Sequence, residues 1–152
     1  MQSRTSAAPR RTPTGPQFTP TTAPSLRTDR VQHYGYAITD AWLLDYSRRH
    51  EHFLQPGEHI DDEFDRMSLT VNVLRIQTGI PRLICEWARP PKVLPPGVEI
   101  GPDKEILVLS VLSTTVESWE TRPSQAQVDV LQSIMGDKKL RWWRDFYHPS
   151  QC

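Results

Sequence analysis

The sequence has little of what a membrane or exported protein needs. Its longest apolar stretch, Ile106 to Leu112, is broken by Ser110, whereas a membrane-spanning helix needs about 20 apolar residues. The N-terminal residues contain no apolar segment of the kind a secretory signal requires. Two cysteines, Cys85 and Cys152, are too few for a disulfide framework. We therefore expect a soluble intracellular protein, cytoplasmic or nuclear, with no membrane partner.

The chain also lacks an excess of either charge. Lysine plus arginine equals aspartate plus glutamate at 18 each, which removes any global attraction to nucleic acid or anionic lipid. The charge is unevenly spread, because residues 1–30 carry five arginines and one aspartate. These residues are rich in Pro, Thr and Ser and cannot bury enough apolar surface to offset their ordering entropy. A disordered basic tail is predicted over 1–30 and one domain over 31–152.

The composition of the tail allows three further hypotheses. Its arginines without acids resemble the composition of a mitochondrial transit peptide, but five prolines would break the required helix, so this is the less favoured alternative. The spacing Arg10-x-x-Pro13-x-x-Pro16 is that of a basic polyproline ligand. Phosphorylation of Thr12, which precedes Pro13, is a third hypothesis for the tail.

Capping residues and apolar spacing predict three helices. Thr39 can cap a first helix, and Gly79 can end the second in the left-handed conformation. Ser124 and Gln127 form a capping box before the third. The second helix carries apolar residues in two rows, which predicts burial on more than one side. The helices are predicted over 39–53, from the acidic cluster at 61–63 to Gly79, and from 124 to Gly136.

Two strands are predicted between the second and third helices. Residues 83–87 and 105–112 are short apolar runs with the composition of strands. The proline-rich stretch 89–102 between them is too long and stiff for a tight hairpin turn. The order helix, helix, strand, strand, helix predicts a single α+β domain with its helices packed on a small antiparallel sheet.

No segment matches a phosphate-binding loop, a dinucleotide fingerprint, a zinc ribbon or a nucleophile elbow. We therefore predict no catalytic residue, no cofactor and no metal ligand. A metal site is the alternative, because one short window holds His50, His52, His59, Asp61, Asp62 and Glu63. Residues two apart on a helix point about 200° apart. His50 and His52 could therefore share one ion only if the helix ended before them, and His50 is favoured as a core histidine.

A cysteine-dependent enzyme is the other catalytic alternative. Cys85 could act as a thiolate with one of the histidines as base and Glu86 as an orienting carboxylate. A cysteine on the Leu83 and Trp87 face of a short strand is more typical of a small buried hydrophobe, whose pKa is raised by burial. Glu86 is expected on the opposite face of that strand.

The C-terminal segment Arg141, Trp142, Trp143 and Arg144 is the candidate interaction surface, extended by Phe146, Tyr147 and His148. Interleaved arginines and aromatics can form a protein-binding hot spot or stack the bases of single-stranded nucleic acid. The second is less favoured because the predicted domain is acidic. The spacing of Leu140, Trp143 and Tyr147 alternatively predicts a helical turn that packs on the core, with both arginines in solvent.

The leading hypothesis is a non-enzymatic intracellular α+β domain that serves as a protein-interaction or structural module. Its contacts are expected from the 89–102 loop, the C-terminal segment and the basic tail. A metal-dependent or cysteine-dependent enzyme is the alternative, and single-stranded nucleic-acid binding is a further one.

Overall fold

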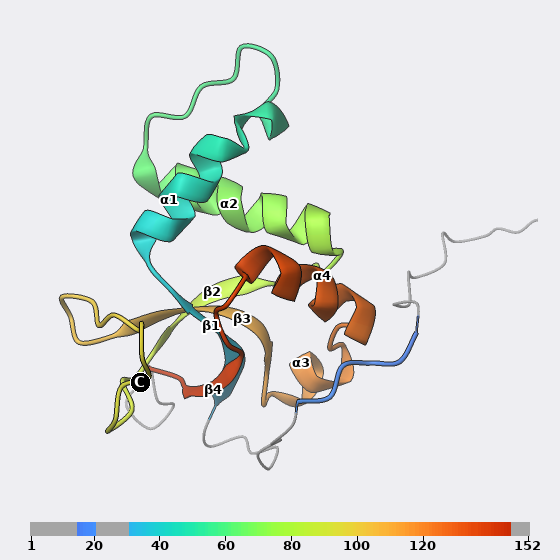
Figure 1. Cartoon of the computed structure of the whole chain (residues 1–152). Helices are drawn as coiled ribbons and strands as arrows, with labels where there is room; N and C mark the ends of the chain where they lie inside the picture. The colour runs from blue at the N-terminus through green and yellow to red at the C-terminus, as the bar shows by residue number, and fades with distance from the viewer. Residues whose placement is uncertain (1–14, 21–30, 147–152) are drawn as a thin grey trace, which may run out of the picture.

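The computed structural model describes residues 15–20 and 31–146, which form a four-stranded antiparallel sheet with helices on one face (Figure 1). The strands are β1 (Gln32–Ile38), β2 (Ile84–Ala88), β3 (Ile106–Ser113) and β4 (Arg141–Arg144), in the order β2-β3-β1-β4. The helices are α1 (Asp40–Arg49), the 3₁₀ helix η1 (Glu51–Phe53), α2 (Glu63–Thr78), α3 (Val116–Glu120) and α4 (Gln125–Met135). The predicted single α+β domain is confirmed.

The predicted helix caps are confirmed. The Thr39 hydroxyl accepts a hydrogen bond from the Trp42 amide at 3.1 Å. Gly79 ends α2 with φ of 75° and ψ of 16°, a conformation that glycine adopts without strain. Ser124 and Gln127 each accept a hydrogen bond from the other's backbone amide, which completes the capping box of α4. Local chemistry therefore sets where these helices begin and end.

The helices differ from prediction in two details. α1 ends at Arg49, because His50 leaves the helical region with φ of −126°, and η1 then continues to Phe53. The burial expected for α2 is incomplete, since Phe64 near its start and Ile76 near its end both remain exposed.

Two strands and one short helix were not predicted. Residues 32–38 form β1, in which Tyr34, Tyr36 and Ile38 point to the helix side of the sheet. The helical turn predicted around Trp143 was wrong: residues 141–144 form β4 and pair with β1. The open edge of β1 offers backbone hydrogen bonds along its length, and this pairing overrides the helical spacing of the side chains. α3 is the short helix that the sequence analysis missed.

Residues 15–20, which the sequence analysis assigned to the tail over 1–30, pack against the domain. Phe18 is buried and its ring stacks on Tyr34 at a centroid distance of 5.8 Å. Its amide donates to the Pro123 carbonyl at 2.8 Å, and the Gln125 amide donates to the Pro16 carbonyl at 2.9 Å. The other residues of the predicted tail, including Arg10, Thr12 and Pro13, lie outside the described residues.

The sheet is curved, and its two edge strands meet at one end. The Phe146 amide donates to the Trp87 carbonyl at 3.0 Å, and the Arg89 amide donates to the Arg144 carbonyl at 2.9 Å. The face enclosed by this contact, here called the inner face, carries a small apolar cluster. The larger core lies on the other face, beneath the helices. The inner cluster consists of Ala88, Ile106, Val108 and Trp143. Within the described residues, none of the helices has the length and apolar character needed to cross a membrane.

Candidate functional site

An apolar groove of about 530 Å³ lies between α2 and β2. Its walls come from the exposed side of α2, the start of α1, and the strands β2 and β3. Phe64 is 70 % exposed and Ile84 is 45 % exposed, so large apolar side chains stand open to solvent here. The lining residues are Asp40, Leu43, Phe64, Met67, Ser68, Val71, Asn72, Arg75, Ile84, Cys85, Trp87 and Leu107.

Polar groups at the rim of the groove are held in fixed positions. The Arg75 guanidinium donates from Nε to the Leu83 carbonyl at 2.7 Å and from Nη1 to the Asn72 side chain at 3.1 Å. Asp40 lies in the first turn of α1, where a carboxylate is favoured by the helix dipole. The groove therefore combines apolar walls with a few oriented polar groups, as binding sites commonly do.

The groove adjoins a strip of unpaired strand edge. β2 is an edge strand of the sheet, and the Trp87 carbonyl on its outer edge is occupied by the Phe146 amide. Backbone groups two residues apart on a strand point the same way, so the Cys85 amide and carbonyl point to that same outer edge. No described residue forms a hydrogen bond with them. The neighbouring Leu83 is already bonded, since its amide donates to the Ile80 carbonyl and its carbonyl accepts from Arg75, so this edge offers a further chain the amide and carbonyl of Cys85.

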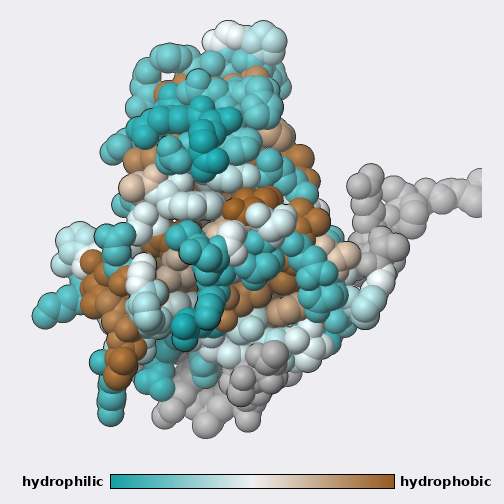
Figure 2. All heavy atoms as spheres, in the orientation of Figure 1, coloured by the Kyte–Doolittle hydropathy of each residue, from teal (hydrophilic) through white to brown (hydrophobic). Residues whose placement is uncertain are grey.

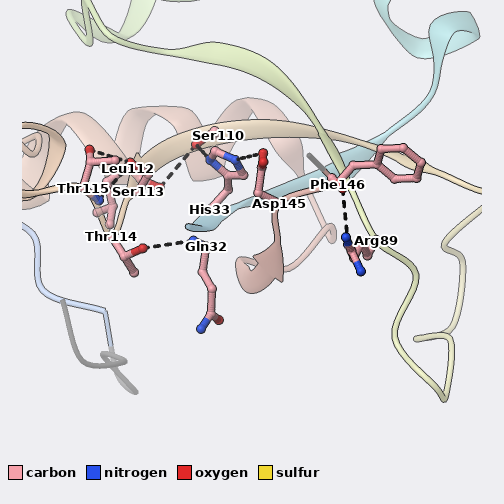
Figure 3. A network of polar contacts seen from close by, with 10 residues as sticks. All are labelled: Gln32, His33, Arg89, Ser110, Leu112, Ser113, Thr114, Thr115, Asp145 and Phe146. Carbon is pink, nitrogen blue, oxygen red and sulfur yellow. Dashed lines mark hydrogen bonds and ion pairs between the residues drawn. The ribbon is translucent and has the colours of Figure 1, made fainter. Parts of the chain in front are cut away.

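A second feature is a polar cluster on the inner face, around His33 of β1 (Figure 3). His33 Nε2 lies 2.8 Å from Asp145 Oδ1, and His33 Nδ1 lies 3.4 Å from Ser110 Oγ. Glu86 of β2 completes the cluster, with its carboxylate near both His33 and Asp145. One ligand-type atom from each of His33, Glu86 and Asp145 lies within 4.8 Å of the others.

The serine, histidine and aspartate of this cluster resemble a hydrolase triad in residue type, but the serine is inaccessible. Ser110 is 4 % exposed, and its hydroxyl also donates to the Leu112 carbonyl at 3.2 Å. A nucleophile must reach the substrate carbonyl and face oxyanion donors. The buried Ser110 hydroxyl has no such access.

Burial raises the pKa of the Glu86 carboxyl, and the nearby Asp145 carboxylate raises it further, while His33 opposes both effects. The Glu86 carboxylate makes no hydrogen bond or ion pair with any described residue. Ionisation of Glu86 therefore costs folding free energy, because its folded pKa lies above its unfolded pKa. The cost is absent at low pH, where the carboxyl is protonated in both states, and grows as pH rises above the ordinary value of 4.5.

Replacing Glu86 with glutamine is thus expected to raise Tm of the metal-free protein at pH 7.5. The gain should shrink and vanish as the pH is lowered towards 4, because the wild-type carboxyl is then neutral as well. Thermal unfolding followed by circular dichroism at several pH values checks this. Glu99→Gln, at an exposed position, is the matched control and should give no comparable pH-dependent gain. An equal Tm gain at all pH values for Glu86→Gln would contradict the expectation.

The histidines and acids of the predicted metal window do not converge. His50 bonds through Nδ1 to the Tyr46 carbonyl at 2.8 Å and stacks on the Tyr46 ring. His52 lies beside it with a centroid distance of 5.6 Å, while the exposed His59 pairs with Asp61 at 3.0 Å. In residues 15–20 and 31–146, the cluster around His33 is the one group with metal-ligand spacing.

Cys85 is a poor nucleophile in this fold. Burial raises the pKa of its thiol to about 12, with the neighbouring Glu86 adding to the effect, so the thiol is protonated at neutral pH. Its side chain faces the groove and the main core, whereas Glu86 faces the polar cluster on the inner face. Glu86 therefore does not orient a Cys85 thiolate.

In the C-terminal segment the two arginines are exposed to solvent, and the two tryptophans pack against the fold. Trp143 is 3 % exposed, and its indole Nε1 donates to the Gly35 carbonyl at 3.1 Å. Trp142 packs on Tyr34 at a centroid distance of 4.9 Å. Arg141 and Arg144 are exposed. The faces needed for base stacking are thus covered, and an interaction role for the segment stays a prediction. Phe146 bonds to β2, while Tyr147 and His148 lie outside the described residues.

In comparisons with known proteins, no family model, no curated protein and no solved structure matches this chain. Functional inference therefore rests on the groove, the strand edge and the polar cluster.

The sequence analysis missed both features for identifiable reasons. His33, Glu86 and Asp145 lie far apart in the sequence, and no local spacing connects them. The alternation of Tyr34, Tyr36 and Ile38 with smaller or polar residues was the available signal for β1. It would have placed His33 on the face opposite the core.

Proposed function

We propose that this protein is a non-enzymatic interaction module that binds an extended apolar segment of a partner protein. The segment would add to the outer edge of β2 and place alternate side chains in the groove against α2. The observation that carries the proposal is the apolar groove beside an unpaired strand edge. We include an intracellular setting in the proposal, because Cys85 is a free thiol.

Strand addition gives affinity through backbone hydrogen bonds and specificity through pockets for alternate side chains. Native proteins usually protect an exposed edge with lysine, proline or an inward-pointing charge. β2 contains no lysine or proline, and its one charge, that of Glu86, points to the inner face rather than along the outer edge. The start of β2 presents Ile84 to solvent instead. An edge of this kind beside exposed Phe64 is suited to a partner that covers both.

The loop between β2 and β3 is a second apolar surface available to a partner. This loop exposes three large apolar side chains, and Figure 2 shows apolar atoms gathered at this end of the molecule, on the left of the view. Exposed apolar patches commonly mark protein contacts. The three residues are Val93, Leu94 and Ile100.

Replacing Phe64 with aspartate is expected to abolish selective peptide binding without unfolding the protein. Short random peptides displayed on phage are first selected on the full chain, and affinities are then measured by fluorescence anisotropy. The selected peptides should carry alternating apolar residues, and Phe64→Asp should weaken them by about tenfold or more. Val116→Asp is the matched control, because Val116 is also an exposed apolar residue in the first turn of a helix.

Methylated peptides test the backbone contacts separately. N-methylation of alternate residues on the side facing β2 should abolish binding, and methylation of the other set should be tolerated. Peptides that bind equally to wild type and Phe64→Asp, or that tolerate both methylation patterns, would refute the proposal. Failure to select any peptide would refute it as well.

A further inference from the structure

We propose that His33, Glu86 and Asp145 form a binding site for a divalent transition-metal ion such as Zn²⁺. This site is separate from the groove, and the inference does not depend on the proposed function. His33 lies in β1, Glu86 lies in β2, and Asp145 directly follows β4. They meet because the curved sheet brings these segments together on its inner face.

The positions of the three residues are fixed by the backbone. The Asp145 amide donates to the Val31 carbonyl at 3.0 Å, and the Phe146 amide donates to the Trp87 carbonyl at 3.0 Å. These bonds hold Asp145 next to both His33 and Glu86. The ligand atoms lie within 4.8 Å of one another, and ligands of tetrahedral zinc are about 3.3 Å apart when each bond is about 2.0 Å. Small side-chain rotations therefore suffice to enclose an ion.

Hydrogen bonds on the far side of the imidazole orient His33 for metal binding. The Ser110 hydroxyl donates to the Leu112 carbonyl at 3.2 Å, so its oxygen can accept a hydrogen bond from His33 Nδ1 at 3.4 Å. In the metal-free protein Nε2 pairs with Asp145 Oδ1 at 2.8 Å. With the proton on Nδ1, held by Ser110, the lone pair of Nε2 would be free to bind an ion on the side of Asp145. Metal-bound histidines are commonly oriented in this way by a partner of the second nitrogen.

The charges of the cluster favour a cation. Among the described ion pairs, Asp145 has His33 as its partner and Glu86 has none. Two carboxylates thus share a largely covered site with one imidazole. Carboxylates withdrawn from water are stabilised by pairing or by coordination of a metal.

The ligand set selects the class of ion. Ca²⁺ and Mg²⁺ prefer sites made of oxygen ligands, whereas an imidazole nitrogen with two carboxylates suits Zn²⁺ and its neighbours in the first transition row. Three protein ligands leave a fourth position for water. A bound ion would join β1, β2 and the end of β4, so binding should also stabilise the fold.

Isothermal titration calorimetry with ZnCl₂ on the chelator-treated full chain tests the site. Cys152 is replaced by serine in all samples, so that its thiol does not compete. We expect one Zn²⁺ per chain, a higher Tm with Zn²⁺, and no such response to MgCl₂. Glu86→Gln and His33→Gln should each weaken Zn²⁺ binding by about tenfold or more.

Controls separate this site from surface histidines and from misfolding. The double variant His52→Gln, His59→Gln should bind Zn²⁺ as the wild type does. Glu86→Gln is expected to be folded and more heat-stable without metal, so its loss of Zn²⁺ binding would not reflect unfolding. Absence of stoichiometric binding would overturn the proposal. Binding that survives Glu86→Gln but is lost in the double variant would overturn it as well.

Discussion

Replacing Gly35 with alanine is expected to prevent the domain from folding, or to lower its free energy of unfolding by about 4 kcal/mol or more. An alanine Cβ at this position would lie 2.1 Å from the Leu109 carbonyl oxygen and 2.9 Å from Val108 Cγ1. The first of these atoms belongs to the backbone of the neighbouring strand, so it cannot rotate away. The two central strands β1 and β3 would have to separate. Urea unfolding followed by circular dichroism measures the effect.

A second glycine provides the control. Gly57 has φ of 82°, and a Cβ added there meets no atom within 4 Å. Gly57→Ala therefore carries only the strain of the left-handed conformation, about 1 to 2 kcal/mol. A Gly35→Ala variant that unfolds at the same urea concentration as Gly57→Ala would show that the strands tolerate the methyl group.

The second large effect is expected at Trp143, whose replacement by alanine should cost about 3 to 5 kcal/mol. Trp143 fills the inner face together with Ala88, Ile106 and Val108, and its indole nitrogen bonds to the Gly35 carbonyl. Removal of the ring leaves a cavity and removes the indole hydrogen bond to the Gly35 carbonyl. Equilibrium unfolding in urea measures the loss.

Comparison with the neighbouring Trp142 distinguishes the contribution of packing from that of the Trp143 hydrogen bond. Trp142 Nε1 is buried and has no hydrogen-bond partner, so Trp142→Phe should be neutral or stabilising. Trp143→Phe should be destabilising by about 1 kcal/mol or more, because it removes the indole hydrogen bond to the Gly35 carbonyl and part of the packed ring. Equal effects of the two phenylalanine variants would contradict this assignment. Because Trp143→Ala is expected to destabilise the fold, its folding should be measured before any loss of partner binding is assigned to the interface.

The helices were predictable because their signals are local. Thr39, Gly79 and the Ser124–Gln127 box each act on backbone groups within a few residues, so their effect can be inferred without knowledge of the fold. β4 was not predictable in this way. Its sequence fits a helical turn and a strand alike, and the choice depends on the edge of β1, a strand at the other end of the domain.

The same distinction applies to the two candidate sites. The apolar rows of α2 indicated a buried helix, but the groove exists because no element within residues 15–20 and 31–146 covers Phe64. The polar cluster depends on the pairing of β1 with β4 and on the contact of residues 144–146 with β2. Without that topology, His33, Glu86 and Asp145 are three unrelated polar residues.

The position of β1 in the middle of the sheet has a consequence for how the chain folds during synthesis. β1 is made first, yet Gly35 pairs with Ser110 on one side and with Arg141 on the other. Contacts over such sequence distances close slowly, because the intervening chain must first lose entropy. A nascent chain therefore carries Tyr34 and Tyr36 without their β3 partners until Leu109 and Leu112 have left the ribosome, and β1 lacks β4 until residues 141–144 follow. During that interval it is a natural client for chaperones that bind exposed apolar strands.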